Sequence, residues 1–460
     1  MNIYISVEIT LRELDSSLLL ATLAASRGHQ VIVSDLESII KSMNIGLISP
    51  GIFHTKSLTP ADHKITRHKA IIDKGFKITS LDEEAGLDIK GHNEFAKTRY
   101  SDQTIEQSSA IFAWGSDDVD TLKKAYPRHS SKIHKTGGPR SDLWKSRFID
   151  YWGVPKKIPK RPFLLVSSNM SRANVNIPFH EIIRMRKKSG YYKSDPKELK
   201  KDFVRIGEDF NRTLAFINAI KYLANNNNGY DIVLRPHPSE NFDAWKFYLE
   251  EIPNVHVIRE GSISAWVNNA FAIMHNRCTT ALEATVSKKP VITYIPFKTD
   301  YYHDTPSNSL GHRVETLDDL LRTANDLFDN RKSNIQNEID KSAHEIISQK
   351  VFLDDNELAA EKMINVWDNI ATDELSKSNN WMIFKWFLKA LKLRKTPSKV
   401  LKSLLPSKFG YHKENQKFPS LNKNDIYDRF TRLQKVLGIK GLKCELLSDR
   451  TILIKGKKFI

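Results

Sequence analysis

Two short segments carry residue types that can hold a phosphate group, and each follows an apolar run. The run Val233 to Pro238 ends in Arg-Pro-His-Pro, which predicts a buried strand with His237 at its tip because proline cannot continue a β-ladder. Ala270 to Met274 predicts a second strand, followed by a turn and a helix over Thr280 to Ser287. Hydroxyls and free N–H groups at a helix start attract phosphate, and an imidazole beside them can neutralise or protonate it. The pattern predicts a site for a diphosphate-like or nucleotide-monophosphate leaving group.

Either segment alone has an ordinary explanation, since His-Pro is common in turns and Thr279-Thr280 can simply cap a helix. Two strand tips of one α/β unit, however, fall on the same edge of a parallel sheet, where open sheets bind ligands. Glu283 either binds ribose hydroxyls or completes a capping box with Thr280, and His275 is either a ligand or a packed residue. The predicted nucleotide- and phosphate-binding residues are Arg235, His237, Thr279, Thr280, Glu283, Ser168 and Asn169, the last two with turn formation as the alternative.

The chain has 460 residues, enough for two domains and an extension. Strand and helix alternate over residues 1–150, which predicts a parallel sheet with helices on both faces. The strands predicted there are Asn2 to Glu8, Gln30 to Ser34, Ile45 to Ile48, Lys77 to Ser80, Ser109 to Trp114 and Lys132 to Thr136.

A second α/β unit is predicted over residues 151–345, closing helices over 346–380 and a basic amphipathic extension over 381–460. Its predicted strands are Phe163 to Ser167, Asp231 to Arg235, Val255 to Ile258, Ala270 to Met274 and Val291 to Tyr294. Residues 171–205 lack periodicity and are expected to form an insertion or mobile loop. Two Rossmann-like domains facing a cleft, with the nucleotide on the C-terminal one, describe the GT-B fold.

Composition indicates the cellular compartment and the charge of the binding partners. Two cysteines, Cys278 and Cys444, favour a reducing compartment, and the chain opens on a strand-like segment with no secretory pattern, so we expect a cytoplasmic protein. A formal charge of +17 predicts anionic partners. Between Trp381 and Tyr411 there are eight Lys or Arg among Leu, Trp and Phe, and no acid. This segment is either an amphipathic anchor on an anionic membrane or a helix packing its apolar face on the domain.

The motifs resemble those of bacterial surface carbohydrate biosynthesis proteins, and the chain is similar to GT-B glycosyltransferases that use CMP-activated acidic sugars, namely Kdo transferases and bacterial sialyltransferases. The resemblance covers most of the chain. It is carried by Arg235-Pro-His-Pro, Thr279-Thr280, Arg12-Glu-Leu-Asp15, Leu81-Asp-Glu-Glu-Ala-Gly86, Phe112-Ala-Trp-Gly115, Thr136-Gly-Gly-Pro-Arg-Ser-Asp142 and Lys417-Phe-Pro-Ser-Leu421.

In the sialyltransferases an acidic-acidic-Gly motif supplies the catalytic carboxylate, and here Ala85 separates the acids from Gly86. The resemblance implies that Glu84 or Glu83 is the base. The residues agree with this, because a strand ending at Ser80 delivers the acids to the cleft edge, where mutual repulsion can raise a carboxylate pKa. The alternative is a solvated acidic turn that starts the next helix.

Arg140, in a turn after a predicted strand, and Arg12 are predicted to contact the sugar carboxylate or the acceptor, since a guanidinium can bind a carboxylate with two hydrogen bonds. A turn residue paired with Asp142 is the alternative for Arg140. No metal is expected, because Asp118-Val-Asp120 fits the acidic first turn of a helix.

The resulting expectation is a glycosyltransferase of cell-surface polysaccharide assembly, cytoplasmic and peripheral to the inner membrane. It would transfer a Kdo- or sialic-acid-like sugar from a CMP-linked donor to a glycan or lipid-linked acceptor, without another cofactor. A retaining reaction would instead use a carboxylate as nucleophile. A sugar-nucleotide epimerase of the same fold is one alternative. A nucleic-acid-binding protein is disfavoured, because the basic residues concentrate in a Leu/Trp-rich segment.

Overall fold

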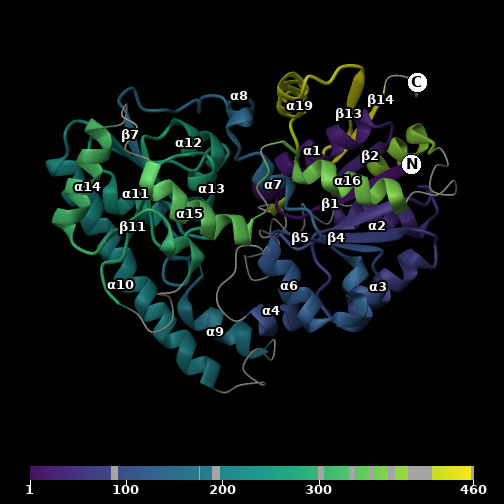
Figure 1. The fold of residues 1–460 in the computed structure, drawn as a ribbon, viewed down its shortest axis with the longest axis horizontal. Coiled ribbons are helices and arrows are strands. Elements are labelled where there is room, and N and C mark those ends of the chain that lie inside the picture. Colours follow the sequence, from purple (N-terminus) through teal and green to yellow (C-terminus); the bar gives the residue numbers. More distant parts are fainter. Residues whose placement is uncertain are drawn as a thin grey trace. The chain divides into compact units, whose positions relative to one another are not determined.

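The computed structural model describes residues 1–83, 92–175, 177–188, 197–298, 305–330, 337–351, 354, 356–370, 379–391 and 417–456. The chain forms two compact units, one from Met1–Tyr151 with Ser348–Ile460 and one from Trp152–Ile347 (Figure 1). Each unit is built on its own sheet flanked by helices, and the predicted α/β class with two Rossmann-like units is confirmed.

The first unit contains an eight-stranded sheet in the order β13-β14-β2-β1-β3-β4-β5-β6. Strands β1 to β6 pair in parallel, whereas β14 runs antiparallel to β2 and to β13. The strands are β1 (Asn2–Val7), β2 (Gln30–Asp35), β3 (Ile52–Thr55), β4 (Lys77–Leu81), β5 (Ala110–Ala113), β6 (Ile133–Lys135), β13 (Leu442–Ser448) and β14 (Thr451–Gly456). Strands β1, β3 and β4 are neighbours, so their carboxyl ends lie together.

Helices cover this sheet, and α1 is the most deeply buried of those described, with Leu and Ala side chains buried along its second half. Helix α16 packs beside it (Figure 1). The helices of the unit are α1 (Thr10–Ser26), α2 (Leu36–Asn44), α3 (Asp62–Ile72), α4 (His92–Arg99), α5 (Asp102–Glu106), α6 (Ser116–Ala125), α7 (Pro139–Asp142), α8 (Ile149–Trp152), α16 (Ala359–Ile370) and α19 (Lys423–Leu437).

The strand predicted at Ile45 to Ile48 is wrong. Asp35 accepts a hydrogen bond from the Ser38 backbone N–H at 3.0 Å, so α2 begins directly after β2, and the chain then turns through Gly46 at φ +67°. The strand of this region is β3, which follows the turn.

Of the predicted basic extension, residues 381–391 and 417–456 are described, and both parts fold onto the first unit. Residues 381–391 are helical and bury Phe384 and Leu388 in the core, while Met382, Ile383 and Trp386 are 70%, 53% and 71% exposed. Within the described ranges, no helix is both long and apolar enough to span a membrane.

The second unit contains a six-stranded parallel sheet in the order β12-β11-β10-β7-β8-β9. Its strands are β7 (Phe163–Ser167), β8 (Asp231–Arg235), β9 (Val255–Val257), β10 (Ala272–His275), β11 (Val291–Tyr294) and β12 (His312–Val314). Its helices are α9 (Phe179–Lys188), α10 (Lys197–Asn226), α11 (Phe242–Leu249), α12 (Ile263–Asn269), α13 (Thr280–Val286), α14 (Leu317–Asp329) and α15 (Asn337–Lys350). Helices α9 and α10 occupy much of residues 171–205, so the mobile-loop alternative for this stretch is wrong.

Candidate functional site

A small polar cavity in the first unit lies where β1, β3 and β4 end. Residues from the three strand ends and from the first turns of α1 line it, together with Pro139. Its polar lining consists of Ser6, Glu13, Ser16, Ser17, His54, Lys56 and Glu83. The carboxyl edge of a parallel sheet is the usual place for a ligand in an α/β unit.

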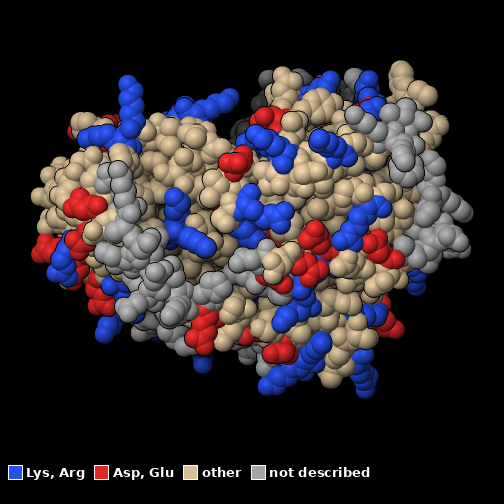
Figure 2. All heavy atoms as spheres, turned by 45° about the horizontal axis from the view of Figure 1, so that its top comes forward, with Lys and Arg blue, Asp and Glu red and all other residues tan. Residues whose placement is uncertain are grey.

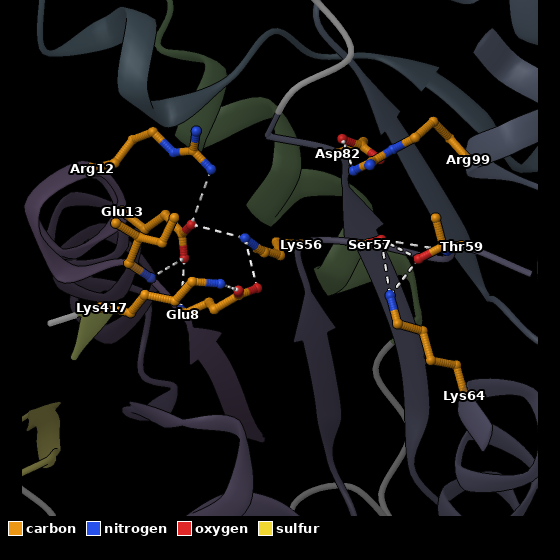
Figure 3. A network of polar contacts seen from close by, with 11 residues as sticks. Glu8, Arg12, Glu13, Lys56, Ser57, Thr59, Lys64, Asp82, Arg99 and Lys417 are labelled. Atoms are coloured by element: carbon orange, nitrogen blue, oxygen red, sulfur yellow. Dashed lines mark hydrogen bonds and ion pairs between the residues drawn. The ribbon is translucent and has the colours of Figure 1, made fainter. Parts of the chain in front are cut away.

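Glu13 is held rigidly at one side of this cavity (Figure 3). Its Oε2 accepts the backbone N–H groups of Glu8 at 2.7 Å and Ile9 at 3.2 Å, and its Oε1 lies 3.2 Å from Lys56 Nζ and 3.6 Å from Arg12 Nη2. The residue is 3% exposed. Glu13 therefore satisfies two backbone N–H groups just before α1 and places a negative charge beside the cavity.

Glu83 lines the same cavity but is much less tightly held. Its Oε2 is buried and has no hydrogen-bond partner among the described residues. Burial first, and then the charge of Glu13, raise the pKa of Glu83 to about 7, although Arg140, Arg12 and Lys56 pull the pKa down. A buried carboxylate with a spare lone pair and a pKa near neutrality has the properties of a general base.

The acidic strand tip is fixed in place by its neighbours. Asp82 is fully buried and receives two hydrogen bonds from Arg99, at 2.6 and 2.8 Å, and its carbonyl accepts the Trp114 indole N–H at 2.8 Å. Gly138 lies so close to the Trp114 ring that a Cβ there would be 2.9 Å from it. Asp82 is thus structural and Glu83 turns to the cavity, while Glu84 lies outside the described residues.

The two predicted arginines adjoin Glu13 and Pro139, which line the same cavity as Glu83, and the charges of both lower the pKa of Glu83. The Arg140 guanidinium sits 5.5 Å from the centre of the Trp144 ring. Asp142 instead accepts the backbone N–H groups of Ala359 at 2.9 Å and Ala360 at 3.0 Å, which start α16. The structure therefore brings Arg12, Arg140 and Glu83 to one edge.

Several residues of this edge were missed by sequence reasoning. Lys56 bridges Glu8 at 2.8 Å and Glu13 at 3.2 Å, and Lys417 also pairs with Glu8. His54 is buried behind them, where desolvation lowers its pKa to about 3, so it is neutral. Lys56 and His54 could have been found only by placing β3 correctly, whereas Glu13 and Lys417 stand in motifs already noted.

In the second unit, strand register gathers the ends of β7, β8 and β10, since Ser167 pairs with both Arg235 and His275. The buried carboxylate of Glu240, also missed from the sequence, accepts hydrogen bonds from the Ser168 hydroxyl, the Met170 backbone N–H and the Trp245 indole. The Asn169 amide donates to the carbonyl of Arg277 at 3.1 Å.

His237 is exposed at the tip of β8. The Ser239 backbone N–H donates to His237 Nδ1 at 3.2 Å, which places the ring proton on Nε2. Arg235 does not extend to this tip. Its guanidinium donates to the carbonyls of Glu260 and Gly261 and lies 5.5 Å from the centre of the Trp266 ring, so we correct its predicted phosphate contact to a structural role.

The threonine pair is arranged differently from a cap. Thr279 occupies the N-cap position of α13, but its side chain makes no cap hydrogen bond. Thr280 is buried, with its hydroxyl 3.1 Å from Cys278 Sγ, and Glu283 is only 2% exposed. His275 is also buried and bonded to the Thr293 hydroxyl at 2.8 Å, which makes it a packed residue. Thr279 is the more accessible hydroxyl of the pair.

A metal site does not emerge from the described ranges, where no cluster of three or more His, Cys, Asp or Glu is suited to one. Asp118, in the first turn of α6, accepts the Trp114 backbone N–H at 3.0 Å. On the face shown in Figure 2, Lys and Arg side chains are scattered among Asp and Glu rather than joined in one basic stripe.

No family model matches the sequence, and no curated protein matches it either. Among solved structures, the chain is similar to a putative UDP-N-acetylglucosamine 2-epimerase from Listeria monocytogenes, with a TM-score of 0.48, 12% identity, and coverage of 80% of this chain and 96% of that one. It is also similar to a glycosyltransferase from Rickettsia africae, with a TM-score of 0.46, 12% identity, and coverage of 81% and 98%.

Proposed function

We propose that this protein is a glycosyltransferase that uses a nucleotide-sugar donor and takes part in assembling bacterial cell-surface polysaccharide. The observation that carries the proposal is Glu83, whose buried and unpartnered Oε2 lies in a polar cavity at the carboxyl edge of a parallel sheet. Burial, together with the charge of Glu13, which two backbone N–H groups anchor, keeps the pKa of Glu83 high. A base in this position suits the activation of an acceptor hydroxyl.

The proposed reaction is a direct displacement. Glu83 takes the proton of the acceptor hydroxyl while the hydroxyl oxygen attacks the anomeric carbon of the donor sugar. The bond between that carbon and the phosphate oxygen breaks, and the nucleotide leaves with the electron pair. On the second unit, His237 Nε2–H would donate to the departing phosphate and Thr279 would bind it in the ground state.

We further propose a CMP-linked acidic sugar, Kdo- or sialic-acid-like, as the donor. Arg12 and Arg140, both close enough to Glu83 to lower its pKa, supply guanidinium groups that suit a sugar carboxylate. The acceptor would be a glycan or a lipid-linked glycan. Incubation of the pure protein with UDP-sugars or CMP-sugars, with and without acceptor, tests the reaction, and an epimerised UDP-sugar formed without acceptor would replace the transferase by an epimerase.

The donor assignment predicts selective stabilisation by CMP. In a thermal-shift series with CMP, UDP, GDP and CDP at matched concentrations, CMP is expected to raise Tm most, because a ligand at about 100 times its Kd adds roughly 2.7 kcal/mol to the free energy of unfolding. Thr279→Val should reduce that shift. Equal shifts for all four nucleotides would refute the CMP preference.

The same proposal places the protein at the cytoplasmic face of the inner membrane through helix 381–391. Its exposed face carries Met382, Ile383 and Trp386, and Lys389 lies 5.9 Å from the centre of the Trp386 ring. Apolar side chains beside lysines suit a surface of anionic lipid. The basic run that follows in the sequence, residues 392–411, adds positive charge but lies outside the described residues.

Replacing Met382, Ile383 and Trp386 together by Ser is expected to weaken binding to anionic liposomes, measured by co-sedimentation at low and high salt. This triple variant is preferable to removing residues 381–460, because that deletion would take β13 and β14 out of the first sheet. Phe247→Ser is the matched control, since Phe247 is 72% exposed on α11 of the other unit. Unchanged binding by the triple variant would contradict the membrane anchor, and the helix would then only pack on the first unit.

A further inference from the structure

A second polar cluster lies on the same sheet edge as the cavity and is not used by the proposed chemistry (Figure 3). It is formed by Ser57 and Thr59, which follow β3, and by Lys64 from α3, with Arg67 one turn further along the same helix. Lys64 Nζ donates to both hydroxyls, at 3.4 Å to Ser57 and closer still to Thr59. The hydroxyls lie 2.9 Å apart, and the Thr59 backbone N–H donates to Ser57 Oγ at 3.3 Å. The ammonium group of Lys64 and the two hydroxyls are therefore held together at the end of β3.

The two cations of this cluster lack a carboxylate partner among the described residues. Both are partly buried, and Arg67 Nε is buried without a hydrogen bond. The carboxylates that act on Lys64 are already engaged, because Asp82 pairs with Arg99 and Glu8 pairs with Lys56 and Lys417. Partly buried cations without a counter-charge are costly to desolvate, so these two cations, which have no carboxylate partner among the described residues, favour an anionic ligand.

His68 lies one turn after Lys64 on α3, and the same positive charges act on its pKa. Its ring is fully buried, and neither nitrogen has a hydrogen-bond partner in the part of the chain that the structure describes. Burial first, and then the charges of Arg67 and Lys64, lower its pKa to about 4. Neutral His68 adds no charge, so the excess positive charge of the cluster remains uncompensated.

We propose that Ser57, Thr59, Lys64 and Arg67 form a subsite for a phosphoryl group of the acceptor. This inference rests on the proposed function and specifies its acceptor as an anionic, phosphorylated glycan or glycolipid. Two cations and two hydroxyls suit the charge and the several acceptor oxygens of a phosphoryl group, for which lysine serves as a point charge. Ser57 directly follows Lys56 and Asp82 directly precedes Glu83, so the subsite and the base occupy neighbouring strand ends.

Direct binding of inorganic phosphate to the full chain tests the subsite without any transfer reaction. Phosphate titrations followed by ³¹P NMR, with and without CMP, would compare the native protein with Lys64→Gln, Arg67→Gln and Thr59→Val. We expect Kd for phosphate at this subsite to rise about tenfold or more in the Lys64 and Arg67 variants, since each removes a charge-assisted contact. Lys69→Gln, an exposed lysine on the same helix, is the matched control and should leave Kd unchanged. Tm values verify folding.

Other arms separate the possible sources of the anion. The variants should raise KM for the acceptor while leaving CMP affinity unchanged, and acetate should not compete with phosphate. Equal competition by acetate, an equal loss of CMP affinity, or phosphate binding that is the same in Lys64→Gln and Lys69→Gln would each overturn the subsite. Glu83→Gln should still bind phosphate. If the native protein binds phosphate through Lys64 but transfers no sugar, the proposed function is contradicted while the phosphate subsite stands.

Discussion

Glu83→Gln is expected to lower sugar transfer by about a hundredfold or more while nucleotide affinity stays unchanged. Gln has nearly the shape of Glu but cannot accept the proton of the acceptor hydroxyl. The measurement pairs the transfer rate with calorimetric nucleotide affinity. Glu37→Gln is the matched control, because Glu37 lies on the surface of α2 with its carboxylate paired to Lys41, and it should keep full activity.

The pH dependence follows from the same carboxyl group. Glu83 accepts a proton only when it is ionised, so kcat/KM should fall as the pH drops below the pKa of about 7. Because the folded-state pKa lies above the unfolded value near 4.5, the native state binds the proton more tightly, and stability is lost as pH rises through about 7. Glu83→Gln should therefore raise Tm at pH 8 relative to the native protein, with little difference near pH 4.

This pair of readouts separates a base from a structural carboxylate. A residue that only held the fold would lower Tm when neutralised, as expected for Asp82 with its two hydrogen bonds from Arg99. Wild-type turnover in Glu83→Gln would remove the catalytic assignment. A loss of both turnover and Tm at pH 8 would make Glu83 a structural residue.

Those strands that are continuous apolar runs with clear boundaries were predictable from the sequence. β7 and β8 match the predicted limits, because buried parallel strands are apolar on both faces and Pro162 and Pro236 bound these two. β3 was missed because its Ile-Phe-His-Thr sequence contains two polar residues, His54 and Thr55. His54 is tolerated there only because Thr79 on the neighbouring strand accepts or donates a hydrogen bond at 3.1 Å, which is a tertiary contact.

The C-terminal strands show how charge can mask a strand. β13 alternates Leu442, Lys443 and Cys444, and the surrounding lysines favoured a surface segment. In the structure β14 pairs with β2 and β13 pairs with β14 at the edge of the sheet, where one face can stay polar. The local sequence does not encode that pairing.

Tertiary contacts also distinguish the acidic residues at the end of β4 from one another. Asp82 and Glu83 have similar side chains, but Arg99 holds the carboxylate of Asp82 and the Trp114 indole its carbonyl, whereas Glu83 lines the cavity. Likewise, Arg235 belonged to the predicted phosphate site until the carbonyls of Glu260 and Gly261 were found to occupy its guanidinium. The sequence predicts that Asp82 and Arg235 lie at the ends of strands. It does not predict their hydrogen-bond partners, which come from other segments of the chain.

His237→Ala is expected to lower turnover by roughly 10² to 10³-fold with little change in nucleotide affinity or Tm. The imidazole is exposed at the tip of β8, so its removal should not disturb packing. The Ser239 N–H holds Nδ1 as an acceptor, which orients the Nε2 proton toward a departing phosphate. That phosphate gains charge only as the bond to the sugar breaks, and the lost interaction should therefore appear in kcat.

Thr279→Val provides the contrast, because its hydroxyl would contact phosphate already present in the ground state, so nucleotide affinity should weaken. His180→Ala is the control for a histidine in the same unit, with a side chain that is 77% exposed on α9. Steady-state rates and calorimetric affinities for the three variants give the comparison. If His237→Ala keeps the turnover of His180→Ala, the imidazole does not meet the leaving phosphate, and the Arg-Pro-His-Pro segment is a turn that ends β8.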